Sequence, residues 1–310
     1  MRFALHIQSN AAPTEESTSI FPTLAAQARW AEDAGFDALS VLDHLEPFAP
    51  VGPRTTPLLE GWTALAGLAA VASRLSLLTL VSNVSLRPAS VLARTAAALD
   101  HVSGGRMALG VGSGGYRPEY RAHGLAYPSF ADRTQLLDET LVAVRALWEQ
   151  PRANFDGRFV QLHDAVCEPK PLHRPWVVVG GRSEPTLEVA ARQANAVNVL
   201  GAGPQDTVAL ARRIGALTEA AGRPAGSVEL TVLERVIMGR TRAEARGAWE
   251  SAGSPARSGH QGLVGTPQEV EEGVRAYASA GVSMLFVHFP PGDERSIELF
   301  AERVLPALRA

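Results

Sequence analysis

The sequence predicts an α/β fold, a (β/α)8 TIM barrel with insertions on its C-terminal rim. Short β-rich apolar runs alternate with longer segments of helical periodicity, which is typical of βα units and a parallel sheet. Eight such strands are predicted, and the chain of 310 residues fits the usual size of this barrel once insertions are added. No linker-like change of composition interrupts the chain, so we expect a single domain over residues 1–310.

Each element is predicted from its own run of residues. The predicted strands cover 2–8, 36–42, 75–82, 106–111, 175–180, 196–200, 228–238 and 283–289. Helices are expected near 22–34, 58–73, 88–102, 132–149, 184–194, 204–221, 241–252, 267–280 and 294–309. The helix near 267–280 has a clear start, because Thr266, Pro267 and Glu269 offer a capping hydroxyl, a first-turn proline and a carboxylate that caps back.

Four stretches are too long or too polar to be simple connections. Segments 43–57 and 113–131 directly follow strands, so they belong on the C-terminal rim, where barrel active sites form. Segment 150–174 contains Asp156-Gly157, which indicates the tip of a β-hairpin. Segment 253–264 is predicted to be a loop and a candidate flap.

Composition favours a soluble enzyme with a small-molecule substrate. The chain is 46% hydrophobic and 20% charged, its net charge is −3, and it has neither a basic stripe for nucleic acid nor an apolar run for a membrane. The N-terminus lacks a signal-peptide pattern, so a cytoplasmic location is expected. The single cysteine, Cys167, excludes a disulfide scaffold, and the single lysine, Lys170, makes Schiff-base catalysis improbable.

Gly110, Gly112 and Gly115 match the spacing of a dinucleotide-binding fingerprint, but their position argues against it. Such a fingerprint needs its glycines between the first strand and a helix that starts at once. Here the glycines follow the fourth predicted strand, and the next convincing helix begins only near 132. We expect instead that they keep the rim bare, so that a flat ring lies against the backbone.

The segments around these glycines carry a family resemblance. The run LTLVSNVSLRPASVLARTAAALDHVSGGRMALGVGSGG (78–115) resembles the luciferase-like monooxygenase superfamily, together with segments 42–44, 133–148, 155–162, 169–192 and 263–270. The resemblance spans nearly the whole chain and is strongest to the F420-dependent oxidoreductases. It implies a (β/α)8 barrel that binds the deazaflavin F420 or FMN at its C-terminal rim, in proteins that are commonly homodimers.

The same resemblance implies the site residues. His44 becomes the leading proton donor or acceptor at the reactive face of the ring, and Asp43 a candidate to orient its imidazole or hold it charged. Ring contacts are implied for a non-prolyl cis peptide at Leu80-Val81 and for Ser82, Asn83, Gly112, Ser113 and Gly114. Phosphate contacts are implied for Gly180, Gly181, Arg182 and Ser183, which open a helix, and for Gly201.

No metal site is predicted. His6 and His288 lie on the first and last strands, which are neighbours in a closed barrel, but no HxH or HExxH pattern accompanies them. Packing or lining of the substrate pocket is the favoured role for this pair. Phe48 and Trp62 are equally suited to the substrate side of the pocket and to the core.

One departure from the family pattern keeps three functions open. Many F420 enzymes of this group carry Glu or Trp where this chain has Gly115, so a catalytic carboxylate is in doubt, although Glu119 is near in sequence. The favoured function is an F420-dependent oxidoreductase that transfers a hydride to or from a small organic substrate. The alternatives are an FMNH2-dependent monooxygenase that uses O2 and a partner flavin reductase, and a flavin-binding paralogue without turnover.

Overall fold

The computed structural model describes residues 1–7, 20–48, 51–252 and 262–309. Most strands lie in one ten-stranded sheet with the order β3-β2-β1-β12-β10-β9-β8-β5-β4, and β11 pairs with β10. The bounds are β1 (Arg2–Ile7), β2 (Ala38–Val41), β3 (Ser76–Thr79), β4 (Ser82–Asn83), β5 (Ala108–Gly112), β8 (Trp176–Gly180), β9 (Ala196–Leu200), β10 (Glu229–Met238), β11 (Leu263–Gly265) and β12 (Val282–His288).

The sheet is parallel and closes on itself. The first strand pairs with β2 on one side and with β12, the last strand, on the other. At the ends of the strand path, a parallel bridge joins Leu77 to Met107, and the Leu77 N–H donates to the Arg106 carbonyl at 2.9 Å. Strand order therefore follows chain order around the barrel, and the predicted (β/α)8 fold is confirmed. The single-domain organisation stays a prediction.

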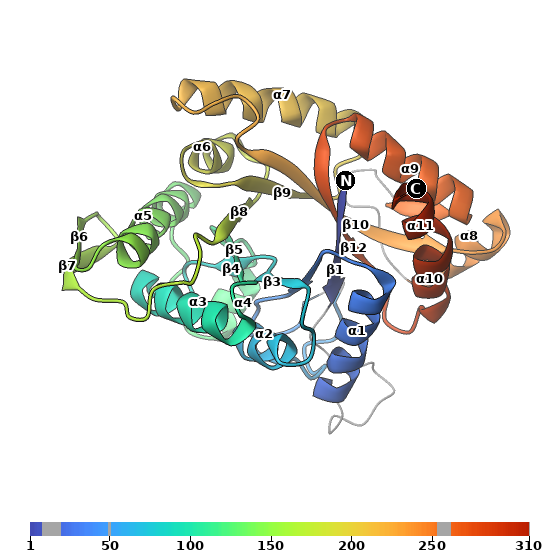
Figure 1. Cartoon of the computed structure of the whole chain (residues 1–310), viewed down its shortest axis with the longest axis horizontal. Helices are drawn as coiled ribbons and strands as arrows, with labels where there is room; N and C mark the ends of the chain where they lie inside the picture. The colour runs from blue at the N-terminus through green and yellow to red at the C-terminus, as the bar shows by residue number, and fades with distance from the viewer. Residues whose placement is uncertain (8–19, 49–50, 253–261, 310) are drawn as a thin grey trace.

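Helices surround the sheet on its outer face (Figure 1). They are α1 (Ile20–Ala34), α2 (Gly61–Ala69), α3 (Ala89–Ser103), α4 (Arg117–Ala122), α5 (Phe130–Glu149), α6 (Glu184–Gln193), α7 (Pro204–Ala220), α8 (Arg242–Ser251), α9 (Pro267–Ser279), α10 (Glu294–Leu299) and α11 (Leu305–Arg309). The predicted helix start at Thr266 is confirmed: its hydroxyl and the Glu269 carboxylate form a reciprocal capping box at the start of α9.

Three predicted stretches need correction or completion. Segment 113–131 contains α4, whose six residues are too few to show helical periodicity in the sequence. The predicted helix 294–309 is interrupted by a π-helical segment at Phe300–Val304. Residues 263–264 belong to β11 and not to a loop, whereas residues 253–261 of the candidate flap lie outside the described part of the chain.

The predicted hairpin is confirmed beside α5. Its strands are β6 (Ala153–Asp156) and β7 (Gln161–Ala165), which pair antiparallel, and Gly157 follows Asp156 at the tip. Figure 1 shows this hairpin outside the main sheet, next to α5.

Side chains alternate between two apolar layers, as the period of a β-strand requires. Ala4, Leu78, Val178 and Phe286 lie in the small cluster that fills the barrel interior. The neighbouring strand residues face outward and join the larger core beneath the helices, for example Phe3. The inward register therefore continues toward the carboxyl ends of the strands, where the candidate site lies.

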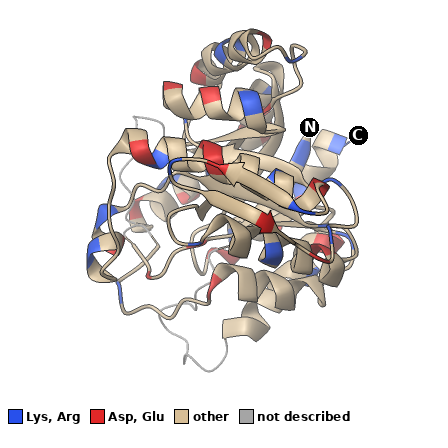
Figure 2. Cartoon of the chain, turned by 90° about the vertical axis from the view of Figure 1, so that its left-hand side faces the viewer, with Lys and Arg blue, Asp and Glu red and all other residues tan. Residues whose placement is uncertain are grey.

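The surface carries both signs of charge. On the face shown in Figure 2, basic and acidic residues are interspersed over the helices, in keeping with the net charge of −3. Among the described residues, no helix combines the length and the apolar character that a membrane span needs.

Candidate active site

At the mouth of the barrel, where the strands have their carboxyl ends, Val81 packs closely against two glycines at the ends of β5 and β8. The Leu80-Val81 peptide bond is cis, as the resemblance implied, and it lies between β3 and β4. A Cβ atom added at Gly112 or at Gly180 would lie 2.8 Å from Val81 Cγ2. Packing around Val81 therefore requires glycine at both positions. At Gly115, in contrast, no atom lies within 4 Å of an added Cβ, so the rim is bare there, as expected.

Ser82 and Asn83 already have protein partners. The Ser82 hydroxyl donates to Asp43 Oδ2 at 2.6 Å and accepts from Trp62 Nε1 at 2.9 Å. The Asn83 amide nitrogen donates to the Tyr120 hydroxyl at 2.7 Å. Both residues are buried, so their bonds fix the chain that follows the cis peptide. Their contact with a cofactor ring stays a prediction.

Asp43 belongs to a buried ion pair. Its side chain is 3% exposed, and its carboxylate accepts from both terminal nitrogens of Arg87, with Nη2 at 2.9 Å from Oδ1. A bidentate arginine contact of this kind fixes the geometry of a carboxylate. These bonds direct the Asp43 carboxylate toward Arg87 and Ser82, and its expected role of orienting the His44 imidazole or holding it charged stays a prediction.

The carboxylate that contacts His44 is Glu119, from α4. His44 Nδ1 lies 3.1 Å from Oε1 and 3.2 Å from Oε2, and the Leu45 N–H donates to Oε1 at 2.6 Å. Glu119 is 1% exposed, whereas the His44 side chain is 25% exposed. Because Glu119 holds Nδ1, Nε2 is the ring nitrogen that can exchange a proton with a ligand.

Glu119 is ionised at neutral pH. Burial raises the pKa of its carboxyl group, but the His44 ring and the backbone N–H groups of Leu45 and Glu46 outweigh burial and hold the pKa below its usual value of 4.5. A negative carboxylate on Nδ1 keeps the Nδ1 proton in place and fixes the ring orientation. A carboxylate four residues after Gly115 thus contacts His44, although it is itself buried.

Aromatic side chains form a wall beside His44. The Phe48 ring lies 4.6 Å from the His44 ring and 5.4 Å from the Tyr116 ring, measured between centroids. Trp62 is 4% exposed and belongs to the core, with its Nε1 bonded to Ser82. Phe48 is therefore suited to the substrate side of the site, and Trp62 supports the site from behind.

The predicted phosphate turn links β8 to α6. Gly181 has a positive φ of 138°, and its N–H donates to the Asn198 carbonyl at 2.9 Å. Ser183 is the N-cap residue of the ten-residue helix α6, and its hydroxyl pairs with Thr186 at 2.8 Å and not with the helix backbone. Arg182 is exposed between them. The turn thus presents a helix N-terminus and an arginine, the groups that suit a phosphate.

The remaining predicted contacts lie at the ends of β5 and β9. Ser113 is buried and Gly114 has a φ of 71°, with Asn83 close to the position of an added Cβ. Gly201 has a φ of 61°, and its N–H donates to the Leu233 carbonyl at 3.2 Å. These residues adjoin the mouth, and their cofactor contacts stay predictions.

Polar side chains of His6, Ser40 and His288 lie in the barrel interior below the mouth. His6 Nδ1 lies 2.9 Å from the Ser40 hydroxyl, and the rings of His6 and His288 meet edge to face at 6.5 Å between centroids. Burial lowers the pKa of His6 to about 4, and burial with repulsion from His6 and Arg235 lowers that of His288 to about 3. Both imidazoles are therefore neutral at pH 7.

Two polar atoms beside this pair of histidines have no hydrogen-bond partner within the described residues. They are His288 Nδ1 and Nη1 of Arg235, the residue that pairs with His288 across β10 and β12. Among the same residues, no group of three or more histidine, cysteine and carboxylate side chains is arranged to hold a metal ion. The pair of histidines alone falls short of the three protein ligands of a catalytic zinc site.

The sequence pattern of luciferase-like monooxygenases matches residues 1–252. The chain belongs to this family. Among its relatives is the pyrimidine monooxygenase RutA of Methylorubrum extorquens strain AM1, 32% identical over 257 residues that cover 80% of this chain and 70% of the relative. RutA of Cronobacter sakazakii is 34% identical over 198 residues, which cover 62% of this chain and 57% of that protein.

Solved structures share the barrel of this luciferase-like chain. The EDTA monooxygenase of Chelativorans sp. BNC1 superposes with a TM-score of 0.85 at 15% identity, covering 100% of this chain and 93% of that one. The F420-dependent tetrahydromethanopterin reductase of Methanopyrus kandleri superposes with a TM-score of 0.81 at 19% identity, covering 99% of both chains. These likenesses show the fold.

Several residues of this luciferase-like site escaped sequence reasoning. The pairing of Glu119 with His44 joins residues 75 positions apart, and Arg87 meets Asp43 from 44 positions away. Arg87 directly precedes Pro88 within the run that carries the resemblance, so the family pattern could have indicated Arg87 as a site residue. Arg235 had no such signal, because it lies within an apolar strand pattern.

Proposed function

We propose that this chain is an FMN-dependent monooxygenase that receives reduced FMN from a partner flavin reductase. One atom of O2 goes to the substrate and the other leaves as water, with two electrons and two protons from the reduced flavin. The identity of 32% to a pyrimidine monooxygenase over 80% of the chain carries this proposal. It favours the FMN alternative over the hydride transfer with F420 that the sequence resemblance first suggested. Homodimer formation and a cytoplasmic location stay predictions.

The proposed substrate is a small planar heterocycle of the pyrimidine class. The relatives are named for pyrimidines, and Arg235 and His288 supply matching polar groups in the inward register of β10 and β12. Arg235 Nη1 is a donor for a ring carbonyl, and the neutral His288 ring is a donor or an acceptor for a ring nitrogen. Both atoms are buried without a partner in the described part of the chain, which supports a polar ligand here.

The residues at the mouth fit a flavin. Reduced FMN, when bound, supplies the electrons that activate O2. The turn at Gly181, Arg182 and Ser183 would hold the phosphate through backbone N–H groups, the start of α6 and a guanidinium group. The bare backbone at Gly115 and the aromatic wall beside His44 would border the ring.

His44 is the proposed proton donor or acceptor at the mouth. Glu119 fixes its ring through Nδ1, so that Nε2 handles the proton. The partly exposed ring can reach a ligand, whereas the buried carboxylate cannot. The contact of Glu119 with His44 supports a catalytic role for the histidine over the non-catalytic alternative.

A binding titration tests the cofactor. Purified protein is titrated separately with oxidised FMN, reduced FMN under anaerobic conditions, and F420, while intrinsic tryptophan fluorescence is followed. We expect saturable binding of reduced FMN and none of F420. Saturable binding of F420 with no response to FMN would reverse the assignment.

Replacing His44 tests the proton step. The variant His44→Asn keeps a polar side chain but cannot act as an acid or base near neutral pH. We expect kcat for the heterocyclic substrate to fall about 100-fold, as for loss of a general acid–base group, with affinity for reduced FMN unchanged. His163→Asn, at an exposed histidine on β7 away from the mouth, is the matched control. Unchanged turnover in His44→Asn removes the histidine from the mechanism.

A further inference from the structure

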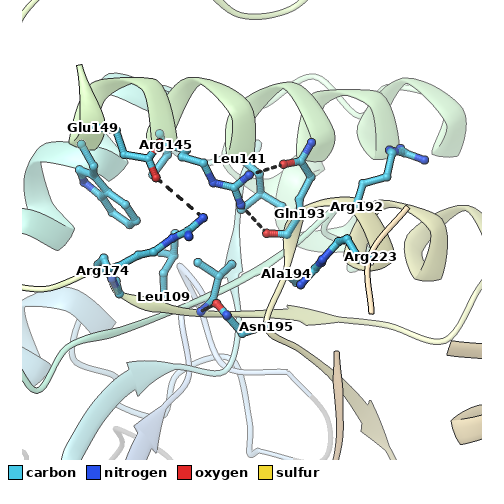
Figure 3. Close-up of a pocket in the computed structure, with 14 residues that line it drawn as sticks. Leu109, Leu141, Arg145, Glu149, Arg174, Arg192, Gln193, Ala194, Asn195 and Arg223 are labelled. Atoms are coloured by element: carbon cyan, nitrogen blue, oxygen red, sulfur yellow. Dashed lines mark hydrogen bonds and ion pairs between the residues drawn. The ribbon is translucent and has the colours of Figure 1, made fainter. Parts of the chain in front are cut away.

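A cavity lies at the end of the barrel opposite the mouth, between the sheet and the surrounding helices (Figure 3). Its lining comes from α5, from the chain just before β8, from the end of α6 and from Arg223 before β10. These are the amino ends of β8, β9 and β10, opposite to the mouth. The cavity holds about 310 Å³, near the lower limit of roughly 300 Å³ for small-molecule sites.

The cavity concentrates positive charge. It is lined by four arginines, with Glu149 as its single acidic residue; they are Arg145, Arg174, Arg192 and Arg223. Burial and the charge of Arg174 lower the pKa of Arg145, and burial with the charges of Arg145 and Arg174 lowers that of Arg223. The guanidinium groups of Arg145, Arg174 and Arg223 are thus close enough to repel one another, whereas Arg192 pairs with Asp138 Oδ2 at 3.0 Å.

Two of these arginines have a structural task that leaves donors unused. Arg145 donates to the Gln193 carbonyl at 2.7 Å and to its side-chain oxygen at 3.0 Å, and Arg223 donates to the Ala191 carbonyl at 2.8 Å. Both therefore satisfy carbonyl groups at the C-terminal end of α6. Each guanidinium has five N–H donors, so both retain donors for a ligand.

Arg174 has no comparable task. Its contact is a 3.8 Å ion pair with Glu149, and the side chains are 76% and 53% exposed. An exposed pair at this distance contributes little to stability. In Figure 3, the Arg174 side chain reaches from below toward Glu149, and the Arg145 guanidinium group lies beside it, bonded to Gln193. Arg174 is thus free to turn toward a ligand beside Arg145.

We propose that this cavity binds a small molecule through a phosphate or pyrophosphate group. Guanidinium groups bind phosphate oxygens bidentately, and several of them match a group that carries more than one negative charge. Val144, Trp148 and Pro175 provide an apolar wall for the remainder of the molecule. The site is separate from the proposed FMN phosphate turn at Arg182, which follows the carboxyl end of β8.

Calorimetric titration with pyrophosphate and with inorganic phosphate, at constant ionic strength, tests the proposal. The variant Arg174→Gln removes the guanidinium with no structural task, and Arg192→Gln tests the rim. Arg246→Gln is the matched control, because Arg246 is 81% exposed and also pairs with a glutamate. Arg182→Gln reports on binding at the mouth. Far-UV circular dichroism verifies folding, and Arg192→Gln decides the outcome if Arg174→Gln fails to fold.

We expect a saturable pyrophosphate site in the cavity of the wild-type protein, with weaker binding of phosphate, beside any anion bound at the phosphate turn of the mouth. Arg174→Gln weakens pyrophosphate binding to the cavity about tenfold, the effect of losing one charge-assisted hydrogen bond, and Arg192→Gln weakens it less. Arg246→Gln binds as the wild type does, and Arg182→Gln weakens only the anion bound at the mouth and leaves the cavity site unchanged. The proposal is overturned if the wild type shows no saturable site, if both cavity variants bind unchanged, or if Arg182→Gln alone abolishes binding.

Discussion

The two ends of the barrel differ in how their charged side chains are paired. At the mouth, Asp43 pairs with Arg87 and Glu119 with His44, so buried charges meet charges or donors of the opposite kind. At the other end, Arg145, Arg174 and Arg223 gather around a cavity and repel one another. The charged pairs of Asp43 and Glu119 at the mouth are thus held by protein partners, whereas the arginines of the cavity outnumber the carboxylates that pair with them and leave positive charge that an anion can offset.

The largest expected effect concerns the buried pair at the mouth. Asp43→Ala leaves Arg87 without its main partner, so the free energy of unfolding should fall by about 3 kcal/mol. Urea unfolding followed by circular dichroism measures it. Arg54→Gln, which breaks a pair whose arginine is 64% exposed, should cost less than about 1 kcal/mol. If the two variants lost equal free energy of unfolding, the buried pair would contribute no more to stability than the exposed pair, which would contradict this prediction.

Next in size is the effect of Glu119 on His44. Glu119→Gln keeps the shape but removes the negative charge that fixes the imidazole, so kcat should fall about 100-fold while KM stays the same. Glu119→Asp should recover part of kcat, since it restores the charge. A loss confined to KM, or no recovery with aspartate, would mean that Glu119 does not position His44.

The neutral histidines below the mouth predict a pH dependence of stability. The folded-state pKa of His6 is lowered to about 4, from 6.5 in the unfolded chain, so the unfolded state binds more protons between these values. Stability is therefore complete above pH 6.5 and is lost as the pH falls toward 4. For His6 the loss is about 2 kcal/mol at pH 5 relative to pH 8. His6→Gln should remove the His6 share of this loss and leave the share of His288, whose pKa is also lowered, whereas the exposed His163→Gln should leave the profile unchanged.

The smallest effect is expected at the opposite end. Arg174→Gln removes one member of a repelling group whose ion pair is exposed, so the free energy of unfolding should change by no more than about 0.5 kcal/mol. A thermal melt without added anion measures it. A loss of unfolding free energy as large as that of Asp43→Ala would show that Arg174 stabilises the folded protein. The two ends of the barrel would then not differ in this respect.

The fold can be predicted from the periodicity of the sequence, whereas the site depends on pairs of residues that lie far apart in the chain. Most strands of the barrel, such as β1, β2 and β5, are short apolar runs, and the barrel follows from the alternation of such runs with segments of helical periodicity. Helix α4 is too short to show a period, so Glu119 remained a nearby residue with no assigned partner. The partners of Asp43 and His44 depend on which strand ends adjoin one another at the mouth, and no local pattern encodes that. The family resemblance supplied the cis peptide at Leu80-Val81, which composition and spacing do not.

Labelled oxygen tests the central claim most directly. The protein is supplied with a flavin reductase, NADH, FMN, a pyrimidine such as uracil and 18O2, and the product is examined by mass spectrometry. We expect one 18O atom in each product molecule, formed only when FMN is present. Turnover of the same chain with F420 in the absence of O2, with no label in any product, would contradict it.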